Sequence, residues 1–450
     1  MRQKILGVAL ALGFCVTSAW AQKINPVWEF LITGENSKIP ILKKNEPAPN
    51  ETWDGTDIYD SYGGLKRYDA NRLLLAVREN GINETDPNHD AALAAQFPDR
   101  SLIWINPADG SPMGVALVIG LKPVPLDPDF LAAGGSDIDY YFTFGVADDG
   151  VIYTGYKNKI LRYEPDGQGG FKAPTVAYTH ENDGSPYWSA WRYETMQVMG
   201  SGADTVILAG GKTWRDKQYY YWFETEDGKT FNWFNEIPFK GGASRPFLSP
   251  DGANVYVVGG DYPGGASGFG INIRRYFFAA GTLDPFEQDP DFAFTAPAID
   301  LENQNYLNTY IGWFTTGYAG YDRWPYFAVY STPSWDTKHS ETSGALGFAA
   351  NPMDTPYLPG WLALHDAATG AYIDGSARML TVTEADELDG DTVGTEQPAS
   401  RWHGTLGDLQ INVLGTGDNA QVELLWNGGI YGIGRYILGE PTRVSDWSLF

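Results

Sequence analysis

The sequence predicts an all-β fold built from repeated four-stranded sheets, and three observations lead to this prediction. Glycine and proline are abundant, with 53 and 28 residues among 450, and both residues mark tight turns. Aromatic residues make up 14% of the chain, which favours strands over helices. Short runs of strand-forming residues recur along the chain, with Asp-Gly turns between them. A long helical bundle is therefore disfavoured.

The repeated unit is clearest between Tyr140 and Tyr178. Four strands are predicted there, at 141–146, 151–154, 160–163 and 175–178, and turns at Asp149-Gly150 and Asp166-Gly167 separate them. The same order returns at 196–234 and 245–278, and weaker copies lie at 73–119, 310–373 and 409–438. The chain therefore contains six units with the pattern of a four-stranded meander.

Meanders of this kind, repeated around an axis, form a β-propeller, because the repetition leaves few sheet edges exposed. We therefore expect one six-bladed β-propeller domain over residues 22–450, with seven blades as the alternative count. The segment from Val27 to Ile32 is expected to close the ring by pairing with the last blade.

Three segments resemble hairpins of known propeller repeats. Phe247 to Val257, with Ser-Pro-Asp-Gly at its turn, resembles WD40-like and TolB-like blades. Leu362 to Gly370 resembles the strand and turn of PQQ-type repeats. Glu224 to Phe231 resembles the Asp-box of sialidase-like propellers, with glutamates at the serine and aspartate positions of that motif. These resemblances imply a propeller fold and no particular activity, because many functions share this fold.

The N-terminus predicts a secretory signal peptide over residues 1–21. Arg2 and Lys4 precede an apolar run, and Ala19-Trp20-Ala21 has the small-x-small pattern of a cleavage site. The single cysteine, Cys15, lies in this segment, so we expect no disulfide in the mature chain. Later apolar runs are shorter than the roughly 18 residues of a membrane helix. We expect a secreted or periplasmic protein that does not insert into a membrane.

The charge of the chain disfavours nucleic acid as a partner. There are 56 acidic and 31 basic residues, which gives a formal net charge of −25. Such a chain is repelled by phosphate backbones.

The long insertions of the predicted blades fall on one face of the propeller. In a radial meander, the connection from the second to the third strand and the connection between blades emerge on the same side. The insertions expected there are Glu79–Arg100, Gly210–Gln218, Gly259–Ile271 and Pro333–Pro359. Because long loops carry function more often than short turns do, we expect this face to bind the ligand.

Arginine and aromatic residues gather in these insertions and between the blades. Arg192, Arg245 and Arg401 would form a positive ring that can bind a carboxylate or another small anion, unless each pairs with a neighbouring acid. The aromatic residues would stack on sugar rings or pack between blades. The candidate ligand-binding residues are Arg192, Arg245, Arg401, Trp191, Trp214, Arg215, Asp261, Tyr262, Asp322, Arg323, Trp402 and His403.

The sequence lacks the common catalytic motifs. The five histidines show no H-E-x-x-H spacing, and there is no G-x-S-x-G or Walker motif. No catalytic residue is assigned and no cofactor is expected. Asp86, Asn88 and Asp90 have the spacing of a calcium loop, but Asp90 is better interpreted as the cap of a short helix from Ala91 to Gln96.

The sequence thus favours a binding or scaffold protein whose partner is a glycan or a protein. A glycan-active hydrolase or lyase, with its active site at the channel mouth, is the alternative, and the sequence leaves open whether the chain is an enzyme.

Overall fold

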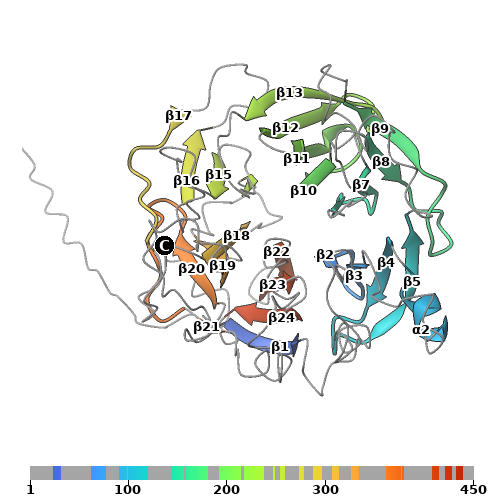
Figure 1. Ribbon diagram of the computed structural model, residues 1–450, viewed down its shortest axis with the longest axis horizontal. Coiled ribbons are helices and arrows are strands. Elements are labelled where there is room, and N and C mark those ends of the chain that lie inside the picture. The colour runs from blue at the N-terminus through green and yellow to red at the C-terminus, as the bar shows by residue number, and fades with distance from the viewer. Residues whose placement is uncertain are drawn as a thin grey trace, which may run out of the picture.

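A computed structural model of the chain describes most of the expected strands and the turns between them (Figure 1). The described residues are 24–31, 62–77, 91–98, 100–119, 143–156, 159–180, 192–213, 217–237, 247–248, 254–258, 273–277, 287–295, 307–313, 326–333, 361–376, 378–379, 408–414, 421–427 and 432–438. The predicted signal peptide lies outside these ranges.

Within the described residues, the strands form six four-stranded sheets. The first sheet contains β2 (Tyr62–Arg67), β3 (Leu73–Val77), β4 (Ser101–Ile105) and β5 (Pro112–Val118). The second contains β6 (Phe144–Val146), β7 (Ile152–Tyr156), β8 (Lys159–Tyr163) and β9 (Thr175–Thr179). The third contains β10 (Arg192–Met199), β11 (Val206–Thr213), β12 (Lys217–Thr225) and β13 (Phe231–Ile237).

The remaining three sheets follow the same plan. The fourth contains β14 (Phe247–Leu248), β15 (Asn254–Val258), β16 (Ile273–Phe277) and β17 (Glu287–Gln288). The fifth contains β18 (Leu307–Trp313), β19 (Tyr326–Pro333), β20 (Trp361–Asp366) and β21 (Arg378–Met379). The sixth contains β22 (Asp408–Leu414), β23 (Gln421–Asn427), β24 (Gly432–Leu438) and β1 (Ile24–Leu31). The described helices are α2 (Ala91–Gln96) and the 3-10 turn η2 (Gly202–Asp204).

The sheets stand around a common centre, and their first strands face it (Figure 1). Each sheet is an antiparallel meander in which sequential strands are hydrogen-bonded neighbours, with β1 added to the last sheet. At four of the junctions, the first strands of successive sheets are in contact, with β6 beside β2 and β10, and β18 beside β14 and β22. Since β22 also contacts β2, the first and last sheets are neighbours. The expected all-β propeller arrangement is confirmed.

The predicted closure by the N-terminal strand is also confirmed. β1 pairs antiparallel with β24, from Ile24 opposite Leu438 to Leu31 opposite Gly432. Trp28 and Phe30 of β1 are buried in one cluster with β3 and β4 of the first sheet. The N-terminal strand therefore completes the last sheet and packs against the first one.

Three sequence predictions differ from the structure. The expected insertion Gly210–Gln218 is largely the end of the β11–β12 hairpin, which stays paired as far as Thr213 opposite Lys217. The expected last strand of the fifth unit, at Tyr372, is an isolated bridge to His365, and the strand itself is β21. β2 was not predicted, because Gly63 and Gly64 lie in it, where its pairing with β3 is irregular. The predicted helix Ala91–Gln96 is confirmed as α2.

The hydrophobic core lies between neighbouring sheets, because each sheet has two faces to bury. Strand β3 is fully buried along its length, from Leu73 to Val77. One cluster joins the first and second sheets, one the second and third, one the fifth and sixth, and one the sixth and first. Of the helices in the described ranges, none has both the length and the apolar character needed to cross a membrane.

His365 on β20 is a buried histidine of this core. Its side chain is 0% exposed and stacks on Phe294 and Phe327, and its Nε2 lies 3.1 Å from the carbonyl oxygen of Thr295. Burial disfavours the charged imidazolium and lowers the pKa of His365 to about 3, despite the backbone groups that favour protonation. This histidine is therefore a neutral core residue at physiological pH.

Gly110 provides a test of how β1 docks. It has φ +72°, and a Cβ atom at this position would clash with the ring of Phe30. Gly167 has φ +77 with nothing within 4 Å, so it has the same backbone strain without the contact. We expect Gly167→Ala to lower the free energy of unfolding by about 1–2 kcal/mol, and Gly110→Ala by about 2–5 kcal/mol. Equal losses in urea unfolding would show that β1 does not pack here.

The pKa of His365 predicts acid sensitivity. An ordinary histidine titrates near 6.5, so between pH 6.5 and about 3 the unfolded chain binds a proton that the folded chain does not. The stability that depends on neutral His365 is present above pH 6.5 and is lost as the pH falls toward 3. We expect the free energy of unfolding to fall up to about 1.4 kcal/mol per pH unit more steeply than in His365→Asn. Identical slopes in the two proteins would contradict this.

Candidate functional site

The two ends of the sheets differ in their connections. The connections from the second to the third strand are long in three sheets, and they run from Val77 to Ser101, from Val258 to Ile273 and from Pro333 to Trp361. We call the end from which they leave the insert face. The opposite end, the turn face, carries the turns that follow the third strands. There, Gly110 and Gly370 each donate an N–H to the carbonyl four residues earlier, at 2.8 Å. These three long connections therefore all leave from the insert face.

Arg192 is the one predicted site residue whose backbone the structure describes. It begins β10 and lies opposite Lys212 of β11, at the insert-face end of the third sheet. The other predicted residues lie outside the described ranges: Trp191, Trp214, Arg215, Arg245, Asp261, Tyr262, Asp322, Arg323, Arg401, Trp402 and His403. The ring of arginines, and the aromatic residues around it, stay predictions. The calcium candidates at 86–90 also fall outside, and no described group of three or more His, Cys, Asp or Glu could hold a metal ion.

The acidic residues of the turn face stabilise their own turns. Asp227 accepts the N–H groups of Lys229 and Thr230 at 2.7 and 2.8 Å, and these bonds lower the pKa of Asp227 to about 2. The Thr225 hydroxyl donates to the same carboxylate at 3.1 Å. The Asp-box motif would place its serine at position 224 and its aspartate at position 226. In this turn, the hydroxyl and the carboxylate both occur one residue later, at Thr225 and Asp227.

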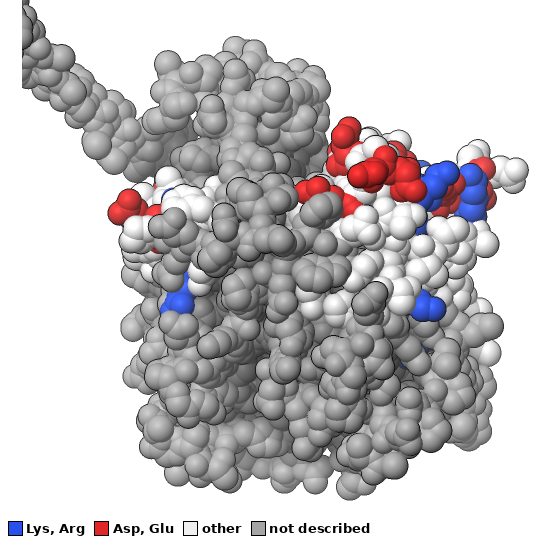
Figure 2. Space-filling model, turned by 90° about the horizontal axis from the view of Figure 1, so that it is seen from above, with Lys and Arg blue, Asp and Glu red and all other residues white. Residues whose placement is uncertain are grey.

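Exposed carboxylates are common on the turn face. In Figure 2, acidic side chains gather along one edge of the described surface. Exposed acids on the turns of the second and third sheets are Asp148, Asp149, Asp204, Glu226 and Asp227. Desolvation by neighbouring groups, and then repulsion by Asp149, raise the pKa of Asp148. Asp149 accepts the N–H groups of Val151 and Gly202, so it helps to join the second sheet to the third.

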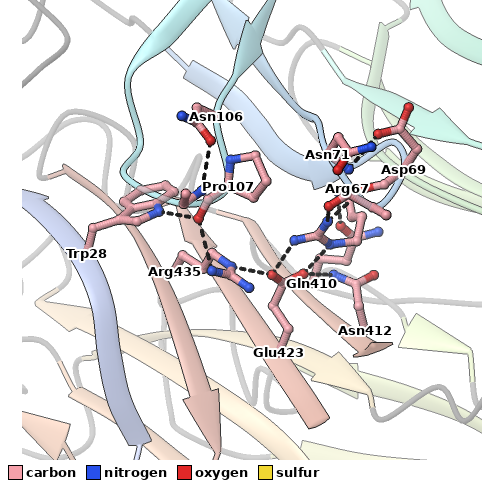
Figure 3. Close-up of polar contacts among 12 residues, drawn as sticks. Trp28, Arg67, Asp69, Asn71, Asn106, Pro107, Gln410, Asn412, Glu423 and Arg435 are labelled. Atoms are coloured by element: carbon pink, nitrogen blue, oxygen red, sulfur yellow. Dashed lines mark hydrogen bonds and ion pairs between the residues drawn. The ribbon is translucent and has the colours of Figure 1, made fainter. Parts of the chain in front are cut away.

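A polar cluster lies where the ring closes, between the sixth and the first sheet (Figure 3). Its centre is Glu423 on β23, which is 0% exposed. Arg67 at the end of β2 donates to both carboxylate oxygens, at 2.6 and 2.5 Å. Arg435 on β24 donates from Nε at 2.5 Å, and Asn412 donates its amide N–H at 3.0 Å. One buried carboxylate thus accepts hydrogen bonds from two guanidinium groups of different sheets.

The cluster extends to the turn between β4 and β5. Arg435 Nη1 and Trp28 Nε1 each donate to the carbonyl oxygen of Pro107, at 2.9 Å. The backbone N–H of Arg67 donates to the Gln410 side chain at 2.7 Å, and its Nη1 donates to the carbonyl of Asp69 at 2.6 Å. The donors of Arg67 therefore bind protein groups, and the cluster is suited to holding two sheets together rather than to binding a ligand.

Sequence reasoning missed Glu423, Arg67 and Arg435. A signal for two of them is present in the sequence, because each is a single charge inside an otherwise apolar strand. Glu423 follows Val422 and precedes Leu424, and Arg435 lies between Ile433 and Ile437. Charged residues are rarely buried without a partner, so two such strands predict a buried ion pair. The pattern does not say which strands meet.

Comparison with known proteins identifies no family. No family model and no curated protein matches the sequence. Many solved structures resemble the fold. TolB from Acinetobacter baumannii is 11% identical with a TM-score of 0.35, over 84% of this chain and 66% of that protein, which is just under two thirds of its length. YCF48 bound to D1 peptide is 13% identical with a TM-score of 0.36, over 84% of this chain and 92% of YCF48.

A third similar structure is the subtype N10 neuraminidase-like protein of A/little yellow-shouldered bat/Guatemala/060/2010. It is 6% identical with a TM-score of 0.38, over 85% of this chain and 96% of that protein. These are likenesses of fold, and the propeller arrangement of this chain rests on its own strand order and on the contacts between its sheets.

Glu423 is the residue whose replacement tests the ring closure. Removing its charge leaves two guanidinium groups without their shared partner in a buried place. We expect Glu423→Gln to lower the free energy of unfolding by about 3–5 kcal/mol. Asp69→Asn is the matched control, because Asp69 pairs with Arg72 at 2.6 Å on the surface, and we expect a loss of about 0–1 kcal/mol. A Glu423 variant as stable as the control would contradict a role in closure.

Proposed function

We propose that the chain is an exported six-bladed β-propeller that binds a glycan or a protein through its insert face. One observation carries this proposal: in the first, fourth and fifth sheets, the long connection between the second and third strands leaves at the same end of the sheets. A rigid scaffold that presents its variable loops on one side is a common way to build a binding surface. Export is proposed from the leader-like residues 1–21.

The contrast between the two faces supports this choice. On the turn face, the described side chains of Asp227 and Asp366 accept backbone N–H groups of their own turns, so these carboxylates serve to close the turns. The insert face carries Arg192 at the start of β10, and we propose that Arg245 and Arg401 accompany it there. In a chain of net charge −25, such arginines would attract an anionic group of the ligand.

The second candidate is a glycan-active hydrolase or lyase at the channel mouth. This chemistry needs two carboxyl groups roughly 5 to 10 Å apart, one of them with a raised pKa. Among the described carboxyl groups with a shifted pKa, that of Asp148 is raised, and Asp148 lies on a turn between the first and second strands of its sheet, away from the insert face. The observations therefore favour binding over catalysis.

A binding assay with variants on both faces tests the proposal. Residues 22–450 would be applied to glycan and peptide arrays, and the dissociation constant of the best ligand would be measured for Trp214→Ala, Arg215→Ala and Arg72→Ala. We expect about tenfold weaker binding for an insert-face variant, because a few aromatic and arginine residues usually dominate a binding site. Arg72→Ala on the turn face should bind as the unchanged protein does.

Two outcomes would contradict the proposal. Loss of binding in Arg72→Ala alone would place the ligand on the turn face. Multiple-turnover release of sugar from an array ligand, measured as new reducing ends, would show that the protein is an enzyme.

A further inference from the structure

Arginine occurs on the third strands of alternate sheets. β8, β16 and β24 belong to the second, fourth and sixth sheets, and each contains an arginine followed by tyrosine, at 162–163, 275–276 and 435–436. The third strands of the other sheets, β4, β12 and β20, contain no arginine. The sheets therefore fall into two alternating types.

Arg275 binds the next sheet as Arg435 does. Arg275 Nη1 donates to the carbonyl oxygen of Ala367 at 2.6 Å, in the turn between β20 and β21 of the fifth sheet. The hydroxyl of Tyr256, which lies opposite Arg275 on β15, donates to the same oxygen at 3.2 Å. On its other side, Arg275 Nε donates to the buried carboxylate of Asp289 at 2.7 Å. Arg435 likewise lies between Glu423 and the carbonyl of Pro107.

The two accepting turns have the same structure. In the turns 106–110 and 366–370, the side-chain oxygen of the first residue accepts the N–H of the third residue at 3.0 Å. The closing glycine donates to the carbonyl of the first residue at 2.8 Å in both turns. Pro107 and Ala367 are each the second residue, so the two arginines bind the same position of equivalent turns.

The same pairs of sheets share further hydrogen bonds. Between the fourth and fifth sheets, the N–H groups of Ala293 and Thr295, which follow β17, donate to the turn carbonyls of Thr369 and Gly370 at 2.8 and 3.1 Å. Between the second and third sheets, the N–H of Asp148 donates to the carbonyl of Gly200 at 2.9 Å.

At this junction between the second and third sheets, Tyr153 lies opposite Arg162. Arg162 also forms an ion pair with Glu164 beside it. Arg162 is therefore fixed by a carboxylate of its own sheet, whereas the hydrogen bonds across this junction come from Asp148 and Asp149.

Two other junctions are packed differently. Between the first and second sheets, Trp104 stacks on Phe171, and Tyr68 meets both rings edge-on. Between the fifth and sixth sheets, the side chains of Leu362 and Leu364 pack in a cluster with Leu409 and others of the last sheet. Apolar contacts are not directional and tolerate small shifts, whereas charge-assisted hydrogen bonds fix position.

We propose that the ring contains two two-sheet units, the fourth with the fifth sheet and the sixth with the first, each held by an arginine latch. An arginine latch is a third-strand arginine that is fixed by a carboxylate of its own sheet and contacts the next sheet. Small movements of the ring occur between units, at the aromatic and apolar junctions. The N-terminal strand closes the ring inside a latched unit, so the closure is one of the rigid junctions.

Hydrogen exchange on the full chain, followed by mass spectrometry, tests the latch. We expect Arg275→Gln to accelerate exchange about tenfold in the turn 366–371 and in 292–295, because hydrogen bonds to charged groups are among the strongest. Arg435→Gln should accelerate exchange in 106–111 and in β1, and neither variant should affect the turn of the other. Lys172→Gln is the control, because Lys172 pairs with Glu164 on the surface of the second sheet, 59% exposed.

The lysine variants keep the test decisive if a glutamine variant does not fold. Arg275→Lys and Arg435→Lys keep the charge but cannot bind the carboxylate and the turn carbonyl together through a planar fork, so the same local pattern is expected. Unchanged exchange in 366–371 for both Arg275 variants would overturn the latch. Equal acceleration in the fifth and sixth sheets on loss of Arg275 would overturn the two-sheet units.

Discussion

Burial of Glu423 between Arg67 and Arg435 is the interaction on which the closed ring depends. An uncompensated carboxylate in the core would be costly, and so would either guanidinium group left alone. Arg435 belongs to the same sheet as Glu423, but Arg67 belongs to the first sheet, so the carboxylate binds both guanidinium groups only when the last sheet stands beside the first. The pairing of β1 with β24 then brings Trp28 to the same junction, where it shares the Pro107 carbonyl with Arg435.

In a ring of this kind, the residues that stabilise the fold differ from the residues proposed to bind the ligand. Its sheets bury their faces against each other, and the turn face uses its polar groups to close turns and to join sheets. Of the long connections at the insert face, the described part includes residues 91–98, where Phe97 packs into the core between the sixth and first sheets. The rest of these connections is the place where insertions are best tolerated. Length and composition can vary there without disturbing the sheets, which is the condition for a surface that evolves toward a ligand.

Polar and apolar junctions have different consequences for such a ring. Where an arginine binds a turn carbonyl, two sheets are held at a fixed distance and angle. Where rings and aliphatic side chains pack, as at Trp104 and Phe171, the contact stabilises the ring but sets its geometry less strictly. A ligand that spans several sheets at the insert face would therefore meet a surface with rigid pairs and adjustable joints between them.

The sequence by itself determined the strands and their grouping, because turn residues and apolar runs act locally. The meander at 144–179, the helix Ala91–Gln96 and the pairing of the N-terminal strand with the last sheet all followed from such patterns. The contacts between neighbouring sheets could not be predicted from such local patterns. Arg67 and Glu423 are 356 residues apart, and Arg275 reaches a carbonyl 92 residues away. Only the tertiary structure decided these contacts, because the closing of the ring, and no property of the neighbouring residues, brings the groups together.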